Sequence, residues 1–139
     1  PQVMKEYWQN SKETKKILKD DWLATGDIAY YDENGYFYIV DRIKQLIFSG
    51  GSNIYPSEVE TILLEHPLID EVAVVGVKDD FLGEVVKAVI VTNENRDVSL
   101  EDVSFFCEDK LAKYKIPRQL EKRQQLPKNF LGKVVKRNL

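Results

Sequence analysis

The sequence predicts an α+β fold, with a small mixed sheet and flanking helices preceded by a β-hairpin segment. The main observation is the order of the expected elements after residue 42: strand, helix, strand, strand, helix and weak strand. This order is typical of helices packed on a sheet. The 139 residues are 43% hydrophobic and 31% charged, which provides enough apolar material for a core. The first residues resemble a separate unit, so we expect a boundary between 1–41 and 42–139.

The first part of the chain is expected to contain a short helix and a hairpin. Residues 13–18 suit a helix with polar surroundings. Residues 28–31 and 36–40 are aromatic and β-branched runs, joined by a turn that contains an Asn-Gly pair. Such a pair between two such runs is a strong hairpin signal. The charged residues 41–44 then predict a break.

The next stretch predicts a short strand, a glycine-containing loop and a helix. Residues 45–48 form the strand, and residues 49–53 form a loop whose two glycines can adopt positive φ. Ser57 and Glu60 have the spacing of a capping box, so a helix is expected to begin near Ser57. Pro67 ends this helix, because proline cannot continue it.

The remaining elements are further strands of the sheet and a second helix that packs on it. Residues 71–77 and 84–92 are rich in valine, which favours buried strands. Ser99 and Asp102 form a second capping pair, so another helix is expected after them. A weak strand is expected around Leu120, although polar residues follow it where a half-buried strand needs apolar ones.

The composition excludes several classes of protein. The net charge of −3 argues against a nucleic-acid binder, because phosphate contacts need a surplus of basic residues. Cys107, the single cysteine, is expected to pack in the core and favours a reducing compartment, so we expect a cytoplasmic protein. With His66 as the single histidine, no metal site is expected. No transmembrane segment or secretory signal is visible. The chain begins with Pro1, so we expect it to be a piece of a longer polypeptide.

The charge is unevenly distributed along the chain. Residues 110–139 hold ten of the 20 basic residues and a single acid, Glu121. A cationic end on an acidic body suggests an anionic partner. A solvated basic segment explains the same pattern, so charge alone leaves both interpretations open.

Four local features could carry chemistry, and each has a plainer interpretation. The Asp27 carboxylate could accept hydrogen bonds from vicinal hydroxyls, although an exposed aspartate in a turn is usually structural. Arg42 and Lys44 could bind an anion or belong to a solvated linker. The glycines of the 49–53 loop could let a ligand approach the backbone. Lys133 could carry a cation on a flexible loop, but the residues around it do not form a P-loop.

The order of these motifs is more specific than any one of them. They are Trp22, Thr25-Gly26-Asp27, Gly35-Tyr36, Asp41-Arg42, Ser49-Gly50-Gly51-Ser52-Asn53-Ile54-Tyr55-Pro56, Tyr114-Lys115-Ile116-Pro117, Leu126-Pro127-Lys128 and Gly132-Lys133. Together they closely resemble the adenylate-forming superfamily, which contains acyl-CoA synthetases, aryl-acid CoA ligases, firefly luciferase and peptide-synthetase adenylation domains. The resemblance implies that residues 1–41 are the tail of the large N-terminal AMP-binding domain and that residues 42–139 are the mobile C-terminal lid domain.

The resemblance also implies the chemistry of nucleotide binding. Family members join a carboxylate to the α-phosphate of Mg-ATP, release pyrophosphate, and pass the acyl group to coenzyme A. Lys133 matches the catalytic lysine, whose ammonium would stabilise two anions as they approach. Asp27 matches a residue that binds the ribose hydroxyls, and Arg42 matches a second contact to ribose and adenylate. Asn53 matches a position near the phosphate.

Further residues are implied for the second half-reaction. Asp41 and Lys44 match the hinge about which the lid rotates, and a hinge needs only a few residues that absorb a change in φ and ψ. Gly50 and Gly51 match a loop that faces the pantetheine channel, where side chains would block the passage.

The chain departs from the family pattern at three positions. Phe48 stands where many relatives have a lysine, four residues after the hinge. Leu131 replaces the usual serine or threonine before the Gly-Lys pair, and Asn129 replaces a common threonine. These departures concern the geometry of the Lys133 loop and the speed of thioester formation.

The expected function is the C-terminal part of an ATP-dependent acyl-CoA synthetase that acts on a fatty or aromatic carboxylic acid. Its partners would be the acid, ATP, coenzyme A and the missing N-terminal domain. Mg²⁺ would be bound mainly through that domain. The loop over 49–56 resembles bacterial CoA ligases, o-succinylbenzoate CoA ligase included. Two alternatives stay open: a ligase that loads a carrier protein, and a non-catalytic nucleotide-sensing module. The fragment alone is expected to be inactive.

Overall fold

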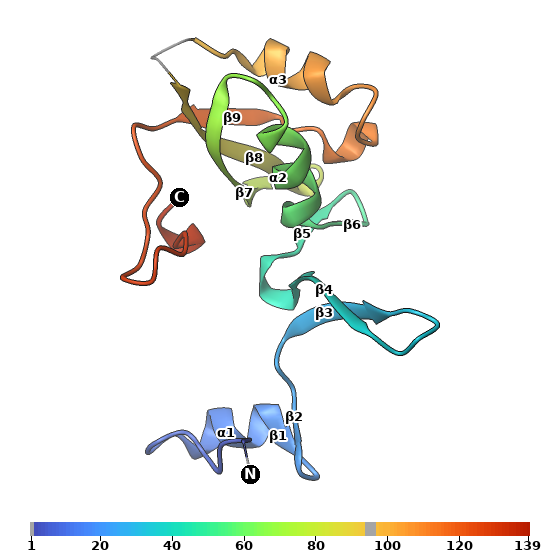
Figure 1. Ribbon diagram of the computed structural model, residues 1–139, viewed down its shortest axis with the longest axis vertical. Coiled ribbons are helices and arrows are strands. Elements are labelled where there is room, and N and C mark those ends of the chain that lie inside the picture. The colour runs from blue at the N-terminus through green and yellow to red at the C-terminus, as the bar shows by residue number, and fades with distance from the viewer. Residues whose placement is uncertain (1, 94–96) are drawn as a thin grey trace. The chain divides into compact units, whose positions relative to one another are not determined.

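The computed structural model describes residues 2–93 and 97–139 of the chain (Figure 1). The chain divides into two compact units, Pro1–Lys44 and Gln45–Leu139. Among the described residues, no helix is both long enough and apolar enough to cross a bilayer.

The first unit contains one helix and two small antiparallel pairs of strands. Its elements are α1 (Ser11–Ile17), β1 (Leu18–Lys19), β2 (Trp22–Leu23), β3 (Asp27–Tyr31) and β4 (Phe37–Arg42). Strand β1 pairs with β2, and β3 pairs with β4. The predicted helix and hairpin are therefore present, each within one or two residues of the expected bounds.

The β3–β4 hairpin turn is held by the Asp32 carboxylate. Asp32 Oδ1 accepts hydrogen bonds from the backbone N–H groups of Asn34 and Tyr36, and Asp32 Oδ2 accepts one from the Tyr38 hydroxyl. These bonds, that of Tyr36 first, lower the pKa of Asp32. Tyr30 stacks on Tyr38 across the hairpin, with ring centroids 5.1 Å apart.

The charged break expected over 41–44 is only half present. Asp41 and Arg42 are the last residues of β4, where they pair with Ile28 and Asp27. Only from Ile43 does the chain leave the strand, as the short 3₁₀ helix η1 (Ile43–Gln45). Asp41 is buried, and its Oδ1 accepts a hydrogen bond from the backbone N–H of Arg42. This bond satisfies one acceptor of the buried carboxylate.

The second unit is a mixed five-stranded sheet with two helices. Its elements are β5 (Ile47–Ser49), β6 (Ser52–Ile54), α2 (Pro56–Leu64), β7 (Ile69–Asp79), β8 (Gly83–Thr92), α3 (Leu100–Cys107), η3 (Lys113–Lys115), β9 (Gln119–Lys122) and η4 (Lys136–Asn138). The sheet order is β6-β5-β8-β7, and β9 also pairs with β8. The β8–β9 pair is parallel and the others are antiparallel, so the predicted mixed sheet is confirmed.

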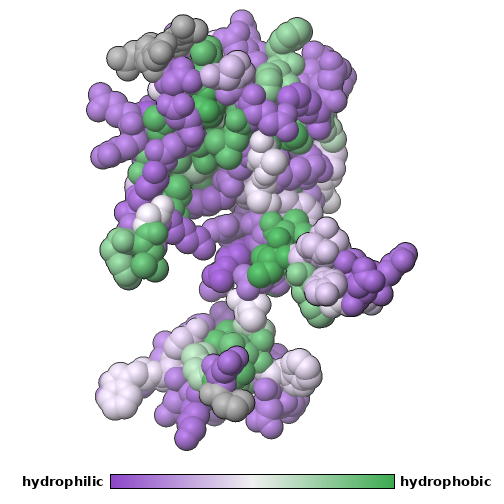
Figure 2. Space-filling view, in the orientation of Figure 1, coloured by the Kyte–Doolittle hydropathy of each residue, from purple (hydrophilic) through white to green (hydrophobic). Residues whose placement is uncertain are grey.

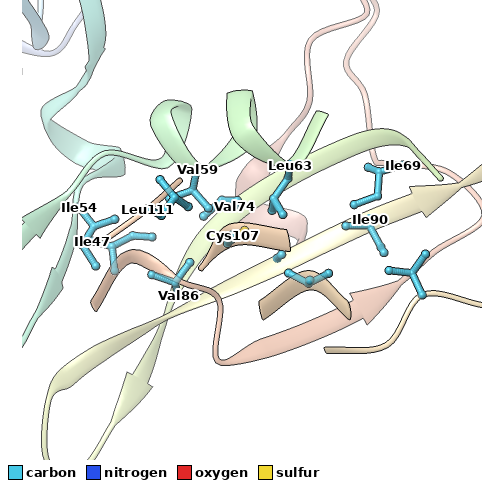
Figure 3. Close-up of a cluster of buried hydrophobic side chains, with 13 residues drawn as sticks. Ile47, Ile54, Val59, Leu63, Ile69, Val74, Val86, Ile90, Cys107 and Leu111 are labelled. Carbon is cyan, nitrogen blue, oxygen red and sulfur yellow. The ribbon is translucent and has the colours of Figure 1, made fainter. Parts of the chain in front are cut away.

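Alternating residues of β8 face two different layers. Val86, Ala88 and Ile90 belong to the larger core, which also contains residues of α2 and α3 (Figure 3). Val89 points to the opposite face, where it packs with Ala73 and with residues from the end of the chain. Because side chains alternate along a strand, one valine-rich strand supports both layers. Cys107 is fully buried in the larger core, as predicted.

The capping box predicted at Ser57 and Glu60 is wrong. Helix α2 begins at Pro56, and its N-cap, Tyr55, makes no side-chain capping bond. Proline fits the first helical position, because it has no N–H to satisfy and its φ is already helical. The helix therefore begins one residue earlier than expected, and Glu60 is free for contacts elsewhere.

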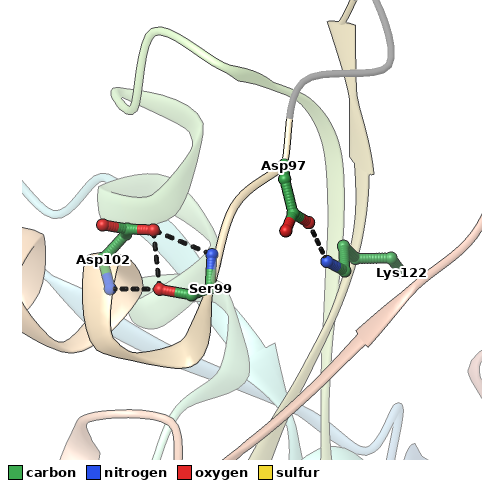
Figure 4. Close-up of polar contacts among 4 residues, drawn as sticks. All are labelled: Asp97, Ser99, Asp102 and Lys122. Atoms are coloured by element: carbon green, nitrogen blue, oxygen red, sulfur yellow. Dashed lines mark hydrogen bonds and ion pairs between the residues drawn. The ribbon is translucent and has the colours of Figure 1, made fainter.

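The second predicted capping pair is confirmed (Figure 4). The Asp102 backbone N–H donates to Ser99 Oγ, and the Ser99 backbone N–H donates to the Asp102 carboxylate. The hydrogen bonds from Ser99 lower the pKa of Asp102.

The weak strand expected around Leu120 is also present, as β9. It runs beside Lys87–Ile90 of β8. Lys122 ends the strand, and its ammonium forms an ion pair with Asp97 instead of packing inside (Figure 4). This partner explains why the polar residue does not prevent strand formation.

Candidate functional site in two units

Asp27 and Arg42 are brought together in the first unit. They are direct partners in the β3–β4 ladder, and Arg42 Nε lies 2.9 Å from Asp27 Oδ1. Thr25 Oγ1 accepts a hydrogen bond from the backbone N–H of Asp27, which fixes the turn before the strand. The pair is partly exposed, so a carboxylate and a guanidinium reach the surface side by side. Together they offer two acceptor oxygens and a fork of donors to a polar ligand.

Asp41 and Lys44 differ in their surroundings. Asp41 is buried within β4, whereas Lys44 is exposed in η1. Of the two expected hinge residues, Lys44 therefore lies outside the strand ladder, in η1 at the end of the first compact unit. Backbone outside the strand ladder can change φ and ψ without breaking strand hydrogen bonds.

The glycine loop is a two-residue turn of a hairpin between β5 and β6. Strand β6 was not predicted. Gly50 and Gly51 have φ of 55° and 83°, which suits a turn with two left-handed residues. Ser49 and Ser52 pair across it. The Gly50 backbone N–H donates to Leu82 O, which ties this turn to the β7–β8 turn. The loop prediction missed β6 because its first residues, Ser52 and Asn53, are of types that favour turns over strands.

Asn53 lies on β6, directly opposite Phe48 of β5. Both side chains are exposed. The backbone N–H of Phe48 donates to Glu84 Oε2 of β8 at 2.8 Å, which ties β5 to the main sheet. Asn53 is thus presented on a hairpin that hydrogen bonds to two residues around the start of β8, Leu82 and Glu84.

Lys133 lies in a loop that is closed by a single side chain. Asn129 Oδ1 accepts hydrogen bonds from the backbone N–H groups of Leu131 and Lys133, at 3.0 and 2.9 Å. The Asn129 backbone N–H also donates to Lys133 O, and the Gly132 N–H donates to Asn129 O. Gly132 has φ of 79°, a conformation that favours glycine. The asparagine that departs from the family pattern therefore organises the loop itself.

The Lys133 ammonium is exposed. Within the described ranges, 2–93 and 97–139, it forms no ion pair with a carboxylate. Most lysines of the basic end are paired, as Lys115 is with Glu58 and Lys136 with Glu60. Lys133 is therefore a cation held by its backbone and available to an anion from outside the chain.

The described residues contain no group of three or more His, Cys, Asp or Glu side chains arranged to hold a metal ion. The Asp27 carboxylate, the candidate partner of the ribose hydroxyls, forms an ion pair with Arg42.

Comparison with known proteins identifies the family. The model of the AMP-binding enzyme C-terminal domain matches residues 58–133, which is more than half of the chain. The chain is 48% identical over 139 residues to a long-chain-fatty-acid–CoA ligase of Bacillus subtilis, covering all of this chain and 25% of that ligase. It is 46% identical over 138 residues to a crotonobetaine/carnitine–CoA ligase of Escherichia coli, covering 99% of this chain and 27% of that ligase.

Two solved structures share the fold. One is o-succinylbenzoate CoA synthetase (MenE) of Bacillus subtilis with the acyl-adenylate OSB-AMP, with a TM-score of 0.87 and 39% identity over 97% of this chain and 28% of that one. The other is ATP-bound MatB of Rhodopseudomonas palustris, with a TM-score of 0.91 and 36% identity over 98% of this chain and 27% of that one. The chain thus spans about a quarter of the length of the relatives it matches. It belongs to the family of AMP-binding enzyme C-terminal domains, within the adenylate-forming enzymes.

Proposed function

We propose that the chain is the C-terminal part of an ATP-dependent acyl-CoA synthetase, which adenylates a fatty or aromatic carboxylic acid and transfers the acyl group to coenzyme A. The proposal depends on Lys133, an exposed ammonium that forms no ion pair with any described carboxylate and lies on a loop closed by Asn129. The similarity of the whole chain to two CoA ligases supports the choice of reaction.

In the first step, Lys133 would act electrostatically. An oxygen of the carboxylate attacks the α-phosphorus of ATP, a new P–O bond forms, and the bond to the bridging oxygen breaks as pyrophosphate leaves. Both reactants are anions, so a cation between them stabilises the transition state.

The other polar residues would bind the nucleotide. The Asp27 carboxylate can accept hydrogen bonds from both ribose hydroxyls, while Arg42 holds the carboxylate in place and donates to the ribose or the adenylate. Asn53, exposed on β6, would donate its side-chain amide near the phosphate.

In the second step, the thiol sulfur of coenzyme A attacks the carbonyl carbon of the acyl-adenylate. The C–O bond to AMP breaks, and the thiol proton is released to the leaving phosphate or to water. We propose that the lid rotates about Asp41 and Lys44 between the two steps. Gly50 and Gly51 would then line the channel for pantetheine, because a turn without side chains leaves room for it.

The rest of the enzyme would come from a large N-terminal domain. The aromatic side chains of the β3–β4 hairpin support this, since Tyr31, Tyr36 and Phe37 are each more than two-thirds exposed. Apolar surface of this kind is commonly covered by another part of a protein. That domain would supply the acid pocket and most ligands of Mg²⁺, and we expect the enzyme to act in the cytoplasm.

Exchange of labelled pyrophosphate into ATP, dependent on a carboxylic acid, tests the proposal in the full-length polypeptide. We expect exchange with some member of a panel of fatty and aromatic acids, followed by thioester formation when coenzyme A is added. Absence of exchange with every acid would favour the non-catalytic module. Exchange without transfer to free coenzyme A would favour a ligase that loads a carrier protein.

A further inference from the structure

The segment that carries Lys133 is attached to the sheet on the face opposite α2 and α3. Leu126 is buried, and Val134 and Leu139 pack with it against Ala73 and Val89. The segment also pairs with itself, because Val135 N–H donates to Pro127 O at 2.7 Å. Residues on both sides of Lys133 therefore form the stem of a loop that lies against the sheet.

The tip of this loop has no such support. Phe130 is 95% exposed and Leu131 is 77% exposed. Figure 2 shows the loop as a protrusion of hydrophobic atoms at the left of the view. Because Phe130 and Leu131 are largely exposed, the position of Lys133 depends on how the stem is held.

Two ion pairs hold the two sides of the stem to the same edge of the sheet. On one side, Lys128 Nζ lies 2.6 Å from Glu71 Oε2 of β7. On the other side, Lys136 Nζ lies 2.6 Å from Glu60 Oε1 of α2. The second pair is the more buried one, since both of its side chains are about one-fifth exposed.

Glu60 also fixes its own position against the sheet. Its Oε1 accepts a hydrogen bond of 2.7 Å from the backbone N–H of Val74. Strand β7 is at the end of the sheet order, so this N–H has no neighbouring strand to bond. One carboxylate oxygen thus joins helix α2, edge strand β7 and the Lys136 ammonium.

We propose that Glu60, through Lys136, is a positioning residue for Lys133. This inference rests on the proposed function, in which Lys133 acts in adenylation. The pair holds the chain three residues after Lys133 on a rigid sheet edge, and so keeps the unsupported loop tip in place. Removal of the pair should loosen the loop without removing any group that contacts a substrate.

The first test measures the two half-reactions in the full-length polypeptide with Lys136→Met. We expect adenylation to slow by about tenfold in kcat, because small misplacements of a catalytic group are costly. Reaction of preformed acyl-adenylate with coenzyme A should keep its wild-type rate. Lys136→Arg should restore most of the adenylation rate, because it keeps a cation opposite Glu60. An equal loss in both half-reactions, or no loss in either, would overturn the proposal.

Lys110→Met is the matched control. It removes another ion pair, between Lys110 Nζ and Glu65 Oε2 at 2.7 Å, at the C-cap of helix α2 and outside the Lys133 segment. We expect wild-type rates in both half-reactions. A slowing of adenylation equal to that of Lys136→Met would show that any weakening of α2 has the same effect, and would overturn the positioning role.

A second measurement separates this inference from the proposed function. Hydrogen exchange of the backbone amides of Lys133 and Val135, measured on the full-length polypeptide, needs no activity. We expect faster exchange in Lys136→Met and wild-type exchange in Lys110→Met. Unchanged exchange in Lys136→Met would overturn the positioning role of the Lys136–Glu60 ion pair, even if the enzyme is active. Faster exchange in a protein that shows no adenylation activity would support the role of the ion pair in holding the loop and would reject the proposed function.

Discussion

Asp27 and Arg42 face each other across the β3–β4 ladder, with Arg42 Nε 2.9 Å from Asp27 Oδ1. Each therefore orients the other, and neither can be replaced without changing the surroundings of its partner. If both contact the nucleotide, they form one binding unit and not two independent contacts.

For this pair we expect Asp27→Ala and Arg42→Ala each to raise the KM for ATP by about tenfold or more, because a hydrogen bond to a charged group contributes about 1.5–3 kcal/mol. The double variant should be little worse than either single one, since the two residues act together. Steady-state kinetics of the full-length polypeptide measure these effects. Tyr38→Phe is the control, because it removes a hydrogen bond to Asp32 elsewhere in the hairpin. Fully additive losses would contradict a shared unit.

The Asn129 side chain gives a second prediction. Asn129→Ala removes the acceptor of two backbone N–H groups, so the Lys133 loop should lose its closed shape. We expect adenylation to slow by about tenfold, as expected for a misplaced catalytic group. Asn129→Thr, which restores the residue common in the family, should retain most of the rate, since its hydroxyl can also accept. Wild-type adenylation by Asn129→Ala would show that the loop is shaped by other contacts.

A third prediction concerns Gly76, which makes room for the Glu84 side chain. A Cβ at Gly76 would lie 3.0 Å from the Glu84 carboxyl group, whose Oε2 accepts from Phe48 N–H. Gly76→Ala should therefore displace the carboxylate and destabilise the fold by about 1 kcal/mol, the net value of a lost hydrogen bond.

Urea unfolding of Gly76→Ala, Glu84→Ala and the double variant tests this explanation. The double variant should be no less stable than Glu84→Ala, because the clash disappears with the side chain. Additive losses would mean that Gly76 has a separate reason to lack a side chain.

A fourth prediction follows from the capping box of α3. Ser99→Ala should cost about 1 kcal/mol of stability, as is typical for a lost N-cap. Because bonds from Ser99 hold the pKa of Asp102 below its usual value of 3.8, the Asp102 carboxylate stabilises the native state above that pH. The stabilisation is lost as pH falls through the lower native pKa.

Thermal unfolding of wild type and Asp102→Ala across pH measures this contribution. The difference in Tm should be present at pH 5 and should shrink below pH 3.8. A difference that grows towards acid would contradict the sign of the pKa shift.

Local signals in the sequence were enough to predict most of the fold. The Asn-Gly turn, the valine-rich strands and the Ser99 capping box depend on residues close together in the chain, and all three are present. The capping box at Ser57 failed because Pro56 competes for the same helix start and has the stronger local effect.

The site was only partly predictable. The motif residues could be named from their order, but some contacts that hold their segments, such as that of Lys136 with Glu60, join residues far apart in the chain. Nothing near Glu60 in the sequence indicates that it bonds to Val74 and Lys136, and nothing near Gly76 indicates Glu84. Such contacts depend on how strands and helices pack, which local patterns do not specify.

The central claim is that the Lys133 ammonium stabilises the adenylation transition state. Lys133→Ala in the full-length polypeptide tests it most directly, with both half-reactions measured on the same preparation. We expect adenylation to fall by about 10²–10³-fold, as when one charge-stabilising group is removed from an active site. The reaction of preformed acyl-adenylate with coenzyme A should continue at the wild-type rate. Adenylation at the wild-type rate, or an equal loss in both reactions, would contradict the account.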